Sequence, residues 1–230
     1  MKTYLPCITL AVFLGSLHLA GAADITGKVT LKGTPKPEIP IQLDATCGKM
    51  QVKPVTTRHY VVGADKGLAN VFVYIKQGAQ KTPATGEGPV LDQVGCMYEP
   101  YVLGVVTGQK LKIRNSDPLL HNVHATPKPG GNKEFNFAQV TKGQVNEKAF
   151  DAQEVLVRMK CDVHPWMFTY VGVVDHPYFA VTDKDGNFTI KNVPPGKYTV
   201  EAVHQKSGPG KTAEVEAGKS VNFEIEVPAS

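Results

Sequence analysis

The sequence has little that would favour a helical or a membrane-spanning protein. Runs with a period of 3.6 residues are almost absent, and short apolar runs are separated by Gly, Pro, Asn and Asp. Only Leu5–Leu19 is long and apolar, and it is too short and too interrupted to span a bilayer. From 230 residues we therefore expect one large or two small soluble domains and no membrane span.

The chain also lacks a strong charge of either sign. Its 25 Lys and Arg against 21 Asp and Glu give a net charge of +4, with basic residues interspersed among acidic ones. This balance does not favour binding to nucleic acid. His-x-x-Glu zinc pairs and nucleophile–base motifs are missing as well. We therefore do not expect an enzyme.

Residues 1–22 have the pattern of a secretory signal peptide. A basic start at Lys2 precedes the apolar run Leu5–Leu19, and Ala20-Gly21-Ala22 offers a small-residue cleavage site. Cys7 lies inside the apolar run, far from that site, and is not expected to be a lipid anchor. The sequence predicts a periplasmic or secreted protein.

Cysteines are few, and without Cys7 their number is odd. Cys47, Cys96 and Cys161 remain. In an oxidising compartment two can pair while the third needs another role. Because Cys161 lies among residue types that bind metals, we expect Cys47 to pair with Cys96. The alternative is that Cys161 joins a disulfide and one of the others is free.

Short β-branched or alternating runs dominate the remaining sequence. Candidate strands are Ile25–Lys32, Leu68–Lys76, Tyr101–Val106, Lys110–Arg114, Glu154–Lys160, Tyr170–Val174, Phe188–Lys191, Tyr198–His204, Thr212–Glu216 and Ser220–Val227. Many short strands at close spacing predict an all-β sandwich or barrel.

Both ends of the chain carry turn motifs of one known type of domain. An opening Gly27-Lys28-Val29 strand is followed by Thr182–Phe188, which reads T-D-K-D-G-N-F, and by Pro194–Tyr198, which reads P-P-G-K-Y. This set resembles the carboxypeptidase regulatory-like, or prealbumin-type, domain, a noncatalytic β-sandwich related in style to immunoglobulin domains. The resemblance implies a split domain, residues 23–88 and 176–230, with residues 89–175 inserted. The alternative is one domain with an N-terminal extension and a separate C-terminal sandwich.

The inserted stretch carries four metal-ligand types in order. His121-Asn122-Val123 follows Asn115-Ser116-Asp117, and Cys161-Asp162-Val163-His164-Pro165-Trp166-Met167 comes forty residues later. This arrangement resembles the cupredoxin family, with the loop spacing of amicyanin. The resemblance implies a Greek-key sandwich that binds one copper ion through His121, Cys161, His164 and Met167.

These residue types suit copper on chemical grounds as well. Thiolate and thioether favour Cu(I), whereas imidazole suits both oxidation states. A strand over Glu154–Lys160 would deliver Cys161 to one end of a sandwich. By alternation, Val155, Val157 and Met159 should share the core face with Cys161.

The family resemblance gives further residues a role. It implies that Asn122 ties the two ligand loops together. Pro165 and Trp166 flank His164 and, with Leu119 and Leu120, are expected to form an apolar docking rim where the His164 ring edge meets solvent. The expected function is single-electron transfer with a redox protein such as a c-type cytochrome or a dehydrogenase. The alternative is a storage, delivery or scaffold module without redox turnover.

The other histidines offer a second hypothesis. His124 should face away from His121 on an extended segment, and His59 should lie at the surface. His124, His176 and His204 would form a second, all-imidazole site if they met at a domain junction. The favoured interpretation is that each is a hydrogen-bonded interface residue. Without His18 of the expected signal peptide, six of the seven histidines remain, too few for a multicopper oxidase.

Overall fold

Nearly all regular structure in this computed structural model, which describes residues 21–228, is β-strand. Sixteen strands form four sheets, accompanied in the described residues by α1 (Ala45–Met50) and the short 3-10 helix η1 (Ala64–Lys66). The all-β fold expected from the sequence is confirmed. The predicted signal peptide lies outside the described residues except for its last two positions. Within residues 21–228, no helix is long and apolar enough to cross a membrane.

Two sheets from the middle of the chain form what we call the central sandwich. The first has the order β5 (Val102–Val106), β11 (Phe168–Val174), β10 (Glu154–Lys160), β7 (His121–Thr126) and β8 (Phe135–Gln139). The second has the order β4 (Met97–Glu99), β3 (Val90–Val94), β6 (Leu111–Asn115) and β9 (Val145–Lys148). Their inner faces share one core of buried apolar side chains, which includes Leu91, Tyr98, Leu111, Ile113, Val123, Phe150, Val157, Met159 and Val171.

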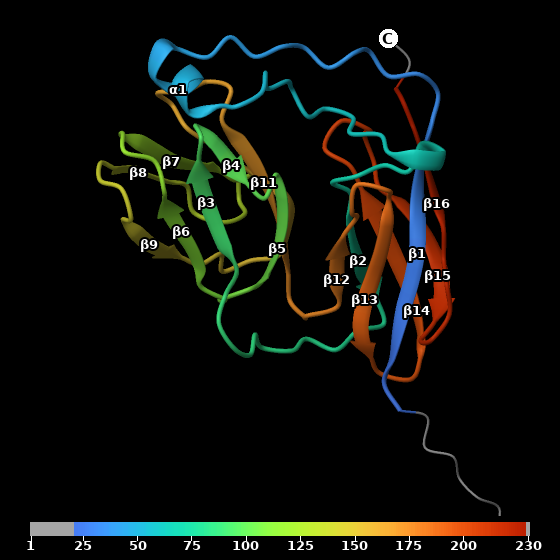
Figure 1. The fold of residues 1–230 in the computed structure, drawn as a ribbon. Coiled ribbons are helices and arrows are strands. Elements are labelled where there is room, and N and C mark those ends of the chain that lie inside the picture. The colour runs from blue at the N-terminus through green and yellow to red at the C-terminus, as the bar shows by residue number, and fades with distance from the viewer. Residues whose placement is uncertain (1–20, 229–230) are drawn as a thin grey trace, which may run out of the picture.

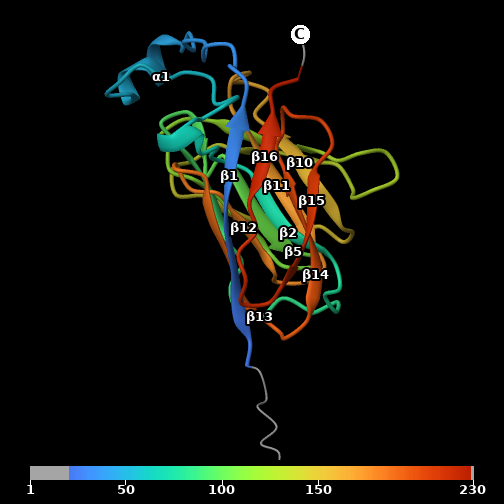
Figure 2. The same cartoon turned by 90° about the vertical axis from the view of Figure 1, so that its right-hand side faces the viewer.

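The two remaining sheets form the outer sandwich, which is built from both ends of the described chain (Figure 1). One sheet has the order β13 (Asn187–Val193), β1 (Ala23–Lys32) and β16 (Phe223–Glu226). The other has the order β12 (Phe179–Val181), β2 (Phe72–Gln77), β14 (Lys197–Val203) and β15 (Lys211–Glu216). Figure 2 shows β1 and β16 side by side, and they pair in parallel. The resemblance of this sandwich to the carboxypeptidase regulatory-like domain stays a prediction.

The two sandwiches meet where two phenylalanine rings lie against two glycines. Gly104 of β5 and Gly172 of β11 are neighbours in the parallel register. A Cβ atom added to Gly172 would lie 2.3 Å from the fully buried ring of Phe72, and one added to Gly104 would lie 2.2 Å from the ring of Phe179. Side chains at these positions would overlap with the rings, so the glycines allow the sheets of the two sandwiches to approach.

We expect Gly172→Ala to destabilise the protein by about 1–3 kcal/mol, because the added methyl group overpacks a well-filled contact. The midpoint of urea unfolding measures this loss. Gly48→Ala is the matched control, since nothing lies within 4 Å of a Cβ atom at that position. Equal midpoints for the two variants would contradict the close contact with Phe72.

Residues 33–62, which we call the covering segment, leave the outer sandwich and cross one end of the central sandwich (Figure 1). The segment contains α1, whose N-terminus is capped by Asp44 through bonds of 2.8 Å from two backbone amides. Leu43, Cys47 and Met50 pack against the central core. Part of the range that the sequence assigned to the outer sandwich therefore contacts the central one instead.

Candidate metal centre

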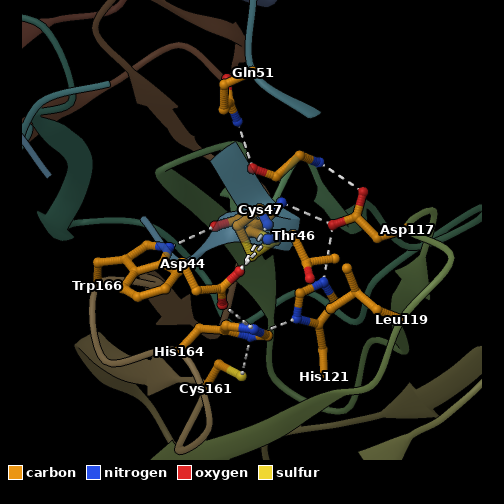
Figure 3. Close-up of a disulfide and its surroundings, with 12 residues drawn as sticks. Asp44, Thr46, Cys47, Gln51, Asp117, Leu119, His121, Cys161, His164 and Trp166 are labelled. Atoms are coloured by element: carbon orange, nitrogen blue, oxygen red, sulfur yellow. Dashed lines mark hydrogen bonds and ion pairs between the residues drawn. A yellow bond between two sulfur atoms is a disulfide. The ribbon is translucent and has the colours of Figure 1, made fainter. Parts of the chain in front are cut away.

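Three candidate ligand atoms converge at the end of the central sandwich beneath the covering segment (Figure 3). His121 begins β7. Cys161 directly follows β10, and His164 lies three residues later in the same loop, before β11. The two Nδ1 atoms of His121 and His164 are 3.0 Å apart, and the Sγ atom of Cys161 is 3.6 Å from Nδ1 of His164. The ligand atoms of all three residues lie within 4.8 Å of one another.

The loop that carries Cys161 and His164 is closed by its own backbone. The Cys161 amide donates to the Met167 carbonyl at 3.0 Å, and the Met167 amide donates to the His164 carbonyl at 2.9 Å. This turn brings Met167 into the central core, where it is fully buried together with Cys161. The axial role of Met167 stays a prediction.

The spacing of these atoms fits a single metal ion. Protein-bound zinc lies about 2.0–2.1 Å from imidazole nitrogen and about 2.3 Å from thiolate sulfur. Two nitrogens on one ion can then be up to about 4 Å apart, and nitrogen and sulfur up to about 4.4 Å. The distances of 3.0 and 3.6 Å fall inside these limits. One ion of that size is therefore within reach of His121, Cys161 and His164 without large movements.

The surroundings of Cys161 favour its thiolate form. Burial would raise the pKa of the thiol, but hydrogen bonds from His121 and from backbone amides, including that of Asn122, outweigh burial and lower the pKa. The Asn122 amide lies 3.4 Å from Sγ. Cys161 is free and almost fully buried. Because the thiolate is the metal-binding form of cysteine, this environment prepares Cys161 as a ligand.

Asp117 fixes the orientation of His121. Its carboxylate lies 2.9 Å from Nε2 of His121 and accepts hydrogen bonds from the Gly95 and Cys96 amides at 2.7 and 2.8 Å. Burial would raise the pKa of Asp117, but these hydrogen bonds outweigh burial and lower it. A proton held on Nε2 leaves the Nδ1 lone pair for a metal. Sequence reasoning did not assign this role, although Asp117 stands four residues before His121.

Asn122 ties β7 to the loop after β10. Its side-chain oxygen accepts a hydrogen bond from the Asp162 amide, and its Nδ2 lies 3.1 Å from the Asp162 carboxylate. Tyr98, which the sequence did not indicate, donates from its hydroxyl to the Asn122 carbonyl at 2.9 Å. The two bonds to Asp162 hold the backbone directly after Cys161 against β7.

His164 is buried, which contradicts the expectation that its ring edge meets solvent. The residue is only 7% exposed, because the covering segment lies over it and places Asp44 3.7 Å from Nε2. Burial lowers the pKa of His164, and the neighbouring His121 adds to that effect. Trp166 donates from its ring nitrogen to the Cys96 carbonyl at 3.0 Å. Pro165 is exposed and Trp166 half-buried, so their docking role stays a prediction.

A disulfide joins the covering segment to the central sandwich. Cys47 of α1 is bonded to Cys96, which lies in the turn between β3 and β4. The Gln51 side chain adds a hydrogen bond to the Gly95 carbonyl in the same turn. The covering segment is thus attached to the turn whose backbone amides donate to Asp117.

The other histidines are not brought together. His124 faces away from His121 and lies 2.8 Å from Asp162 and 2.6 Å from Glu134. His176 lies 2.8 Å from the Ile75 carbonyl, and His204 contacts Ser207 and stacks on Tyr60. None of the three belongs to a group of potential metal ligands within residues 21–228. His59 is half-buried rather than at the surface.

The core face expected for β10 is interrupted by a shift in strand register near its start. Val157 and Met159 lie in the central core with Cys161, as alternation predicts. Val155 packs instead in the cluster between the sandwiches. The register shifts between Glu154 and Val157, and Leu156 has a φ of 61°, so alternation does not continue through this point.

No protein-family model and no curated protein matches the chain. Among solved structures, it is similar to a copper-containing nitrite reductase from Thermus scotoductus SA-01 at 18% identity and a TM-score of 0.35, over 45% of this chain and 25% of that chain. It thus spans a quarter of the reductase. A point mutant of amicyanin in the reduced Cu(I) form is 25% identical with a TM-score of 0.34, over 44% of this chain and 97% of that chain. A purple cupredoxin from Nitrosopumilus maritimus is 28% identical with a TM-score of 0.29, over 34% and 81%.

Proposed function

We propose that this protein binds one copper ion through His121, Cys161 and His164, with Met167 as a weak fourth ligand, and carries single electrons. The observation that supports it is the convergence of a buried thiol and two imidazole nitrogens within 4.8 Å. A His₂Cys set with a weak thioether is the donor set of electron-transfer copper sites. Copper bound there would supply a one-electron couple between Cu(I) and Cu(II).

The ligand side chains are held before any ion binds. Asp117 orients His121, while the Asn122 amide and side chain hold Cys161 and its loop. Fixed ligands move little when the charge of the centre changes, which favours electron transfer. The same restraint selects against metals that need other geometries.

The burial of His164 favours a second candidate, a protein that holds copper without rapid exchange of electrons. The covering segment lies over the imidazole that the electron-transfer hypothesis needs near a partner. The rate of electron self-exchange between oxidised and reduced protein distinguishes the two functions. Fast self-exchange supports electron transfer, and a rate near zero supports storage or delivery.

The test of copper binding is the visible spectrum of the protein after one equivalent of Cu(II). We expect an intense thiolate-to-copper band that disappears on reduction. A colourless protein that binds the ion would contradict the Cys161 site.

The remaining expectations belong to the same proposal. We place the protein in a periplasmic or secreted compartment, on the basis of residues 1–22. Its partner would be a redox protein such as a c-type cytochrome or a dehydrogenase, and the chain itself would not be an enzyme. Residues 23–88 and 176–230 would form one domain and residues 89–175 the other.

We expect Met167→Leu to retain copper and to raise the reduction potential. Leucine removes a weak donor and leaves an apolar contact, which disfavours the more highly charged Cu(II). A tenfold change in the relative affinity for the two oxidation states corresponds to about 59 mV. Voltammetry measures the shift, with the buried Met97→Leu as matched control. An unchanged spectrum and potential would remove Met167 from the ligand set.

A further inference from the structure

The Cys47–Cys96 disulfide lies directly against the candidate metal centre. Both sulfur atoms and a ring nitrogen of His164 lie within 4.8 Å of one another, and all three residues are buried. The Cys96 sulfur is also within 4.8 Å of a carboxylate oxygen of Asp117 and a ring nitrogen of His121. Figure 3 shows His164 between Cys161 on one side and Cys47 on the other. His164 is therefore shared by two groups of potential ligands.

The covering segment closes the centre, so an ion needs a way in. His121 and Met167 are fully buried, Cys161 is 1% exposed and His164 7%. The regular structure of the covering segment is limited to the six-residue α1 and two isolated bridges, Pro40 with Thr56 and Val62 with Leu68. Segments with little sheet pairing open more easily than central strands. The disulfide restrains that opening, because it fixes α1 to the turn before β4.

We propose that Cys47 and Cys96, in the reduced dithiol form, make a second metal site with His164 that takes Cu(I) and passes it to the centre. This inference rests on the proposed copper function. Reduction removes the covalent bond that holds the covering segment and converts the disulfide into two soft sulfur ligands, which suit Cu(I). Because His164 belongs to both groups, the ion changes partners from Cys47 and Cys96 to His121 and Cys161 without leaving the protein.

The chemistry balances as two thiol–disulfide exchanges. A dithiol reductant attacks the Cys47–Cys96 bond, is itself oxidised to a disulfide, and leaves two thiols on the protein. Cu(I) displaces the thiol protons as it binds. After the ion has moved to Cys161, exchange with a disulfide oxidant restores the Cys47–Cys96 bond and closes the segment. Copper stays Cu(I) throughout.

The experiment uses the chain from Ala23 with Cys161→Ser, so that the thiolate of the centre is absent. Cu(I) is titrated without oxygen against a coloured Cu(I) chelator, once with the disulfide intact and once after reduction by a dithiol and its removal. We expect one Cu(I) per reduced chain, bound at least tenfold more tightly than by the oxidised chain. The matched control also carries Cys47→Ser and Cys96→Ser and should lose this gain. Equal affinities, or a disulfide that the dithiol does not reduce in the folded protein, would overturn the proposal.

A second measurement distinguishes metal binding by the two thiols from a simple opening of the covering segment over the centre. The rate of Cu(I) uptake is compared for oxidised wild type, reduced wild type and the Cys47→Ser/Cys96→Ser double variant. We expect reduced wild type to load at least tenfold faster than both. If the double variant loads as fast as reduced wild type, the thiols are not ligands and the site is refuted. A different result would refute the proposed copper function itself. In that case the wild-type protein would show no coloured Cu(II) centre, whether its disulfide is oxidised or reduced.

Discussion

A Cys161→Ser protein is expected to remain folded and to lose the coloured Cu(II) centre completely. The intense band requires a thiolate bonded to copper, and Cys161 is the free thiol within residues 21–228. A serine hydroxyl does not ionise at neutral pH and is a hard oxygen donor that suits copper poorly. His121 and His164 would still bind Cu(II), but without the band.

The variant should also bind Cu(I) about 100-fold more weakly. Four-ligand zinc sites in small domains bind with roughly 10–16 kcal/mol, or about 3 kcal/mol for each ligand. At 1.4 kcal/mol for each factor of ten, one ligand accounts for about two orders of magnitude. Competition with a Cu(I) chelator, with the disulfide kept oxidised, measures this loss.

Val163→Ser is the matched control for Cys161→Ser. It lies in the same loop, is 52% exposed, and its side chain offers no metal ligand in the wild type. We expect this control to keep both the band and the Cu(I) affinity. A band that persists in Cys161→Ser would show that another group supplies the charge-transfer donor and would refute the proposed ligand set.

The ligand loop was predictable because its signal is local. Cys161, His164 and Met167 lie within seven residues, and the strands on both sides have clear apolar runs. The expected strand Glu154–Lys160 is β10, and Tyr170–Val174 lies within β11. The distant His121 could be added from the Asn115–Asp117 run that precedes it. Local spacing therefore indicated which residues converge at one end of a sandwich.

Edge strands and strand ends were harder to predict. Phe135–Gln139 and Val145–Lys148 form β8 and β9, which were not expected, and both lie at sheet edges. β9 reads V-N-E-K and has little apolar character, whereas β8 offers only the short alternation of Phe135 and Phe137. The expected strand Leu68–Lys76 begins four residues before β2, because its first apolar residues lie in the connection before that strand.

The burial of His164 was beyond sequence reasoning for a different reason. The segment that covers it comes from residues 33–62, more than a hundred positions earlier in the chain, and has no periodic pattern. Only the Cys47–Cys96 pairing hinted that this segment approaches the centre. A tertiary contact made by an irregular segment leaves almost no trace in local sequence.

Asp117→Asn should weaken copper binding by roughly 10–100-fold, the usual loss when a partner of a metal-bound histidine is removed. An amide NH₂ facing Nε2 of His121 favours the tautomer with its proton on Nδ1, the atom that would otherwise hold the metal. The amide also accepts the Gly95 and Cys96 hydrogen bonds less well than the carboxylate. Because Asp117 and the Cys96 amide are buried, we expect the metal-free protein to lose about 1–3 kcal/mol of stability as well.

The pH dependence of stability provides a second signature of Asp117. Its pKa is lowered in the folded protein, so its stabilising effect is full above the carboxyl's unfolded pKa. That effect is lost as the pH falls through the folded pKa. Asp117→Asn has no carboxyl to titrate and should lose this part of the acid dependence in unfolding experiments on the metal-free protein.

Asp65→Asn makes the same chemical change far from the centre and serves as the control. Asp65 is exposed and forms only a 3.8 Å ion pair with Lys28 in the outer sandwich. It should leave copper affinity unchanged and stability within about 0.5 kcal/mol. Nitrogen-15 chemical shifts of the His121 ring report the tautomer directly. If Asp117→Asn keeps the proton of His121 on Nε2 and still binds copper as tightly as wild type, the positioning role of Asp117 is refuted, and a loss of stability alone would mean that Asp117 serves only to hold the Gly95–Cys96 turn.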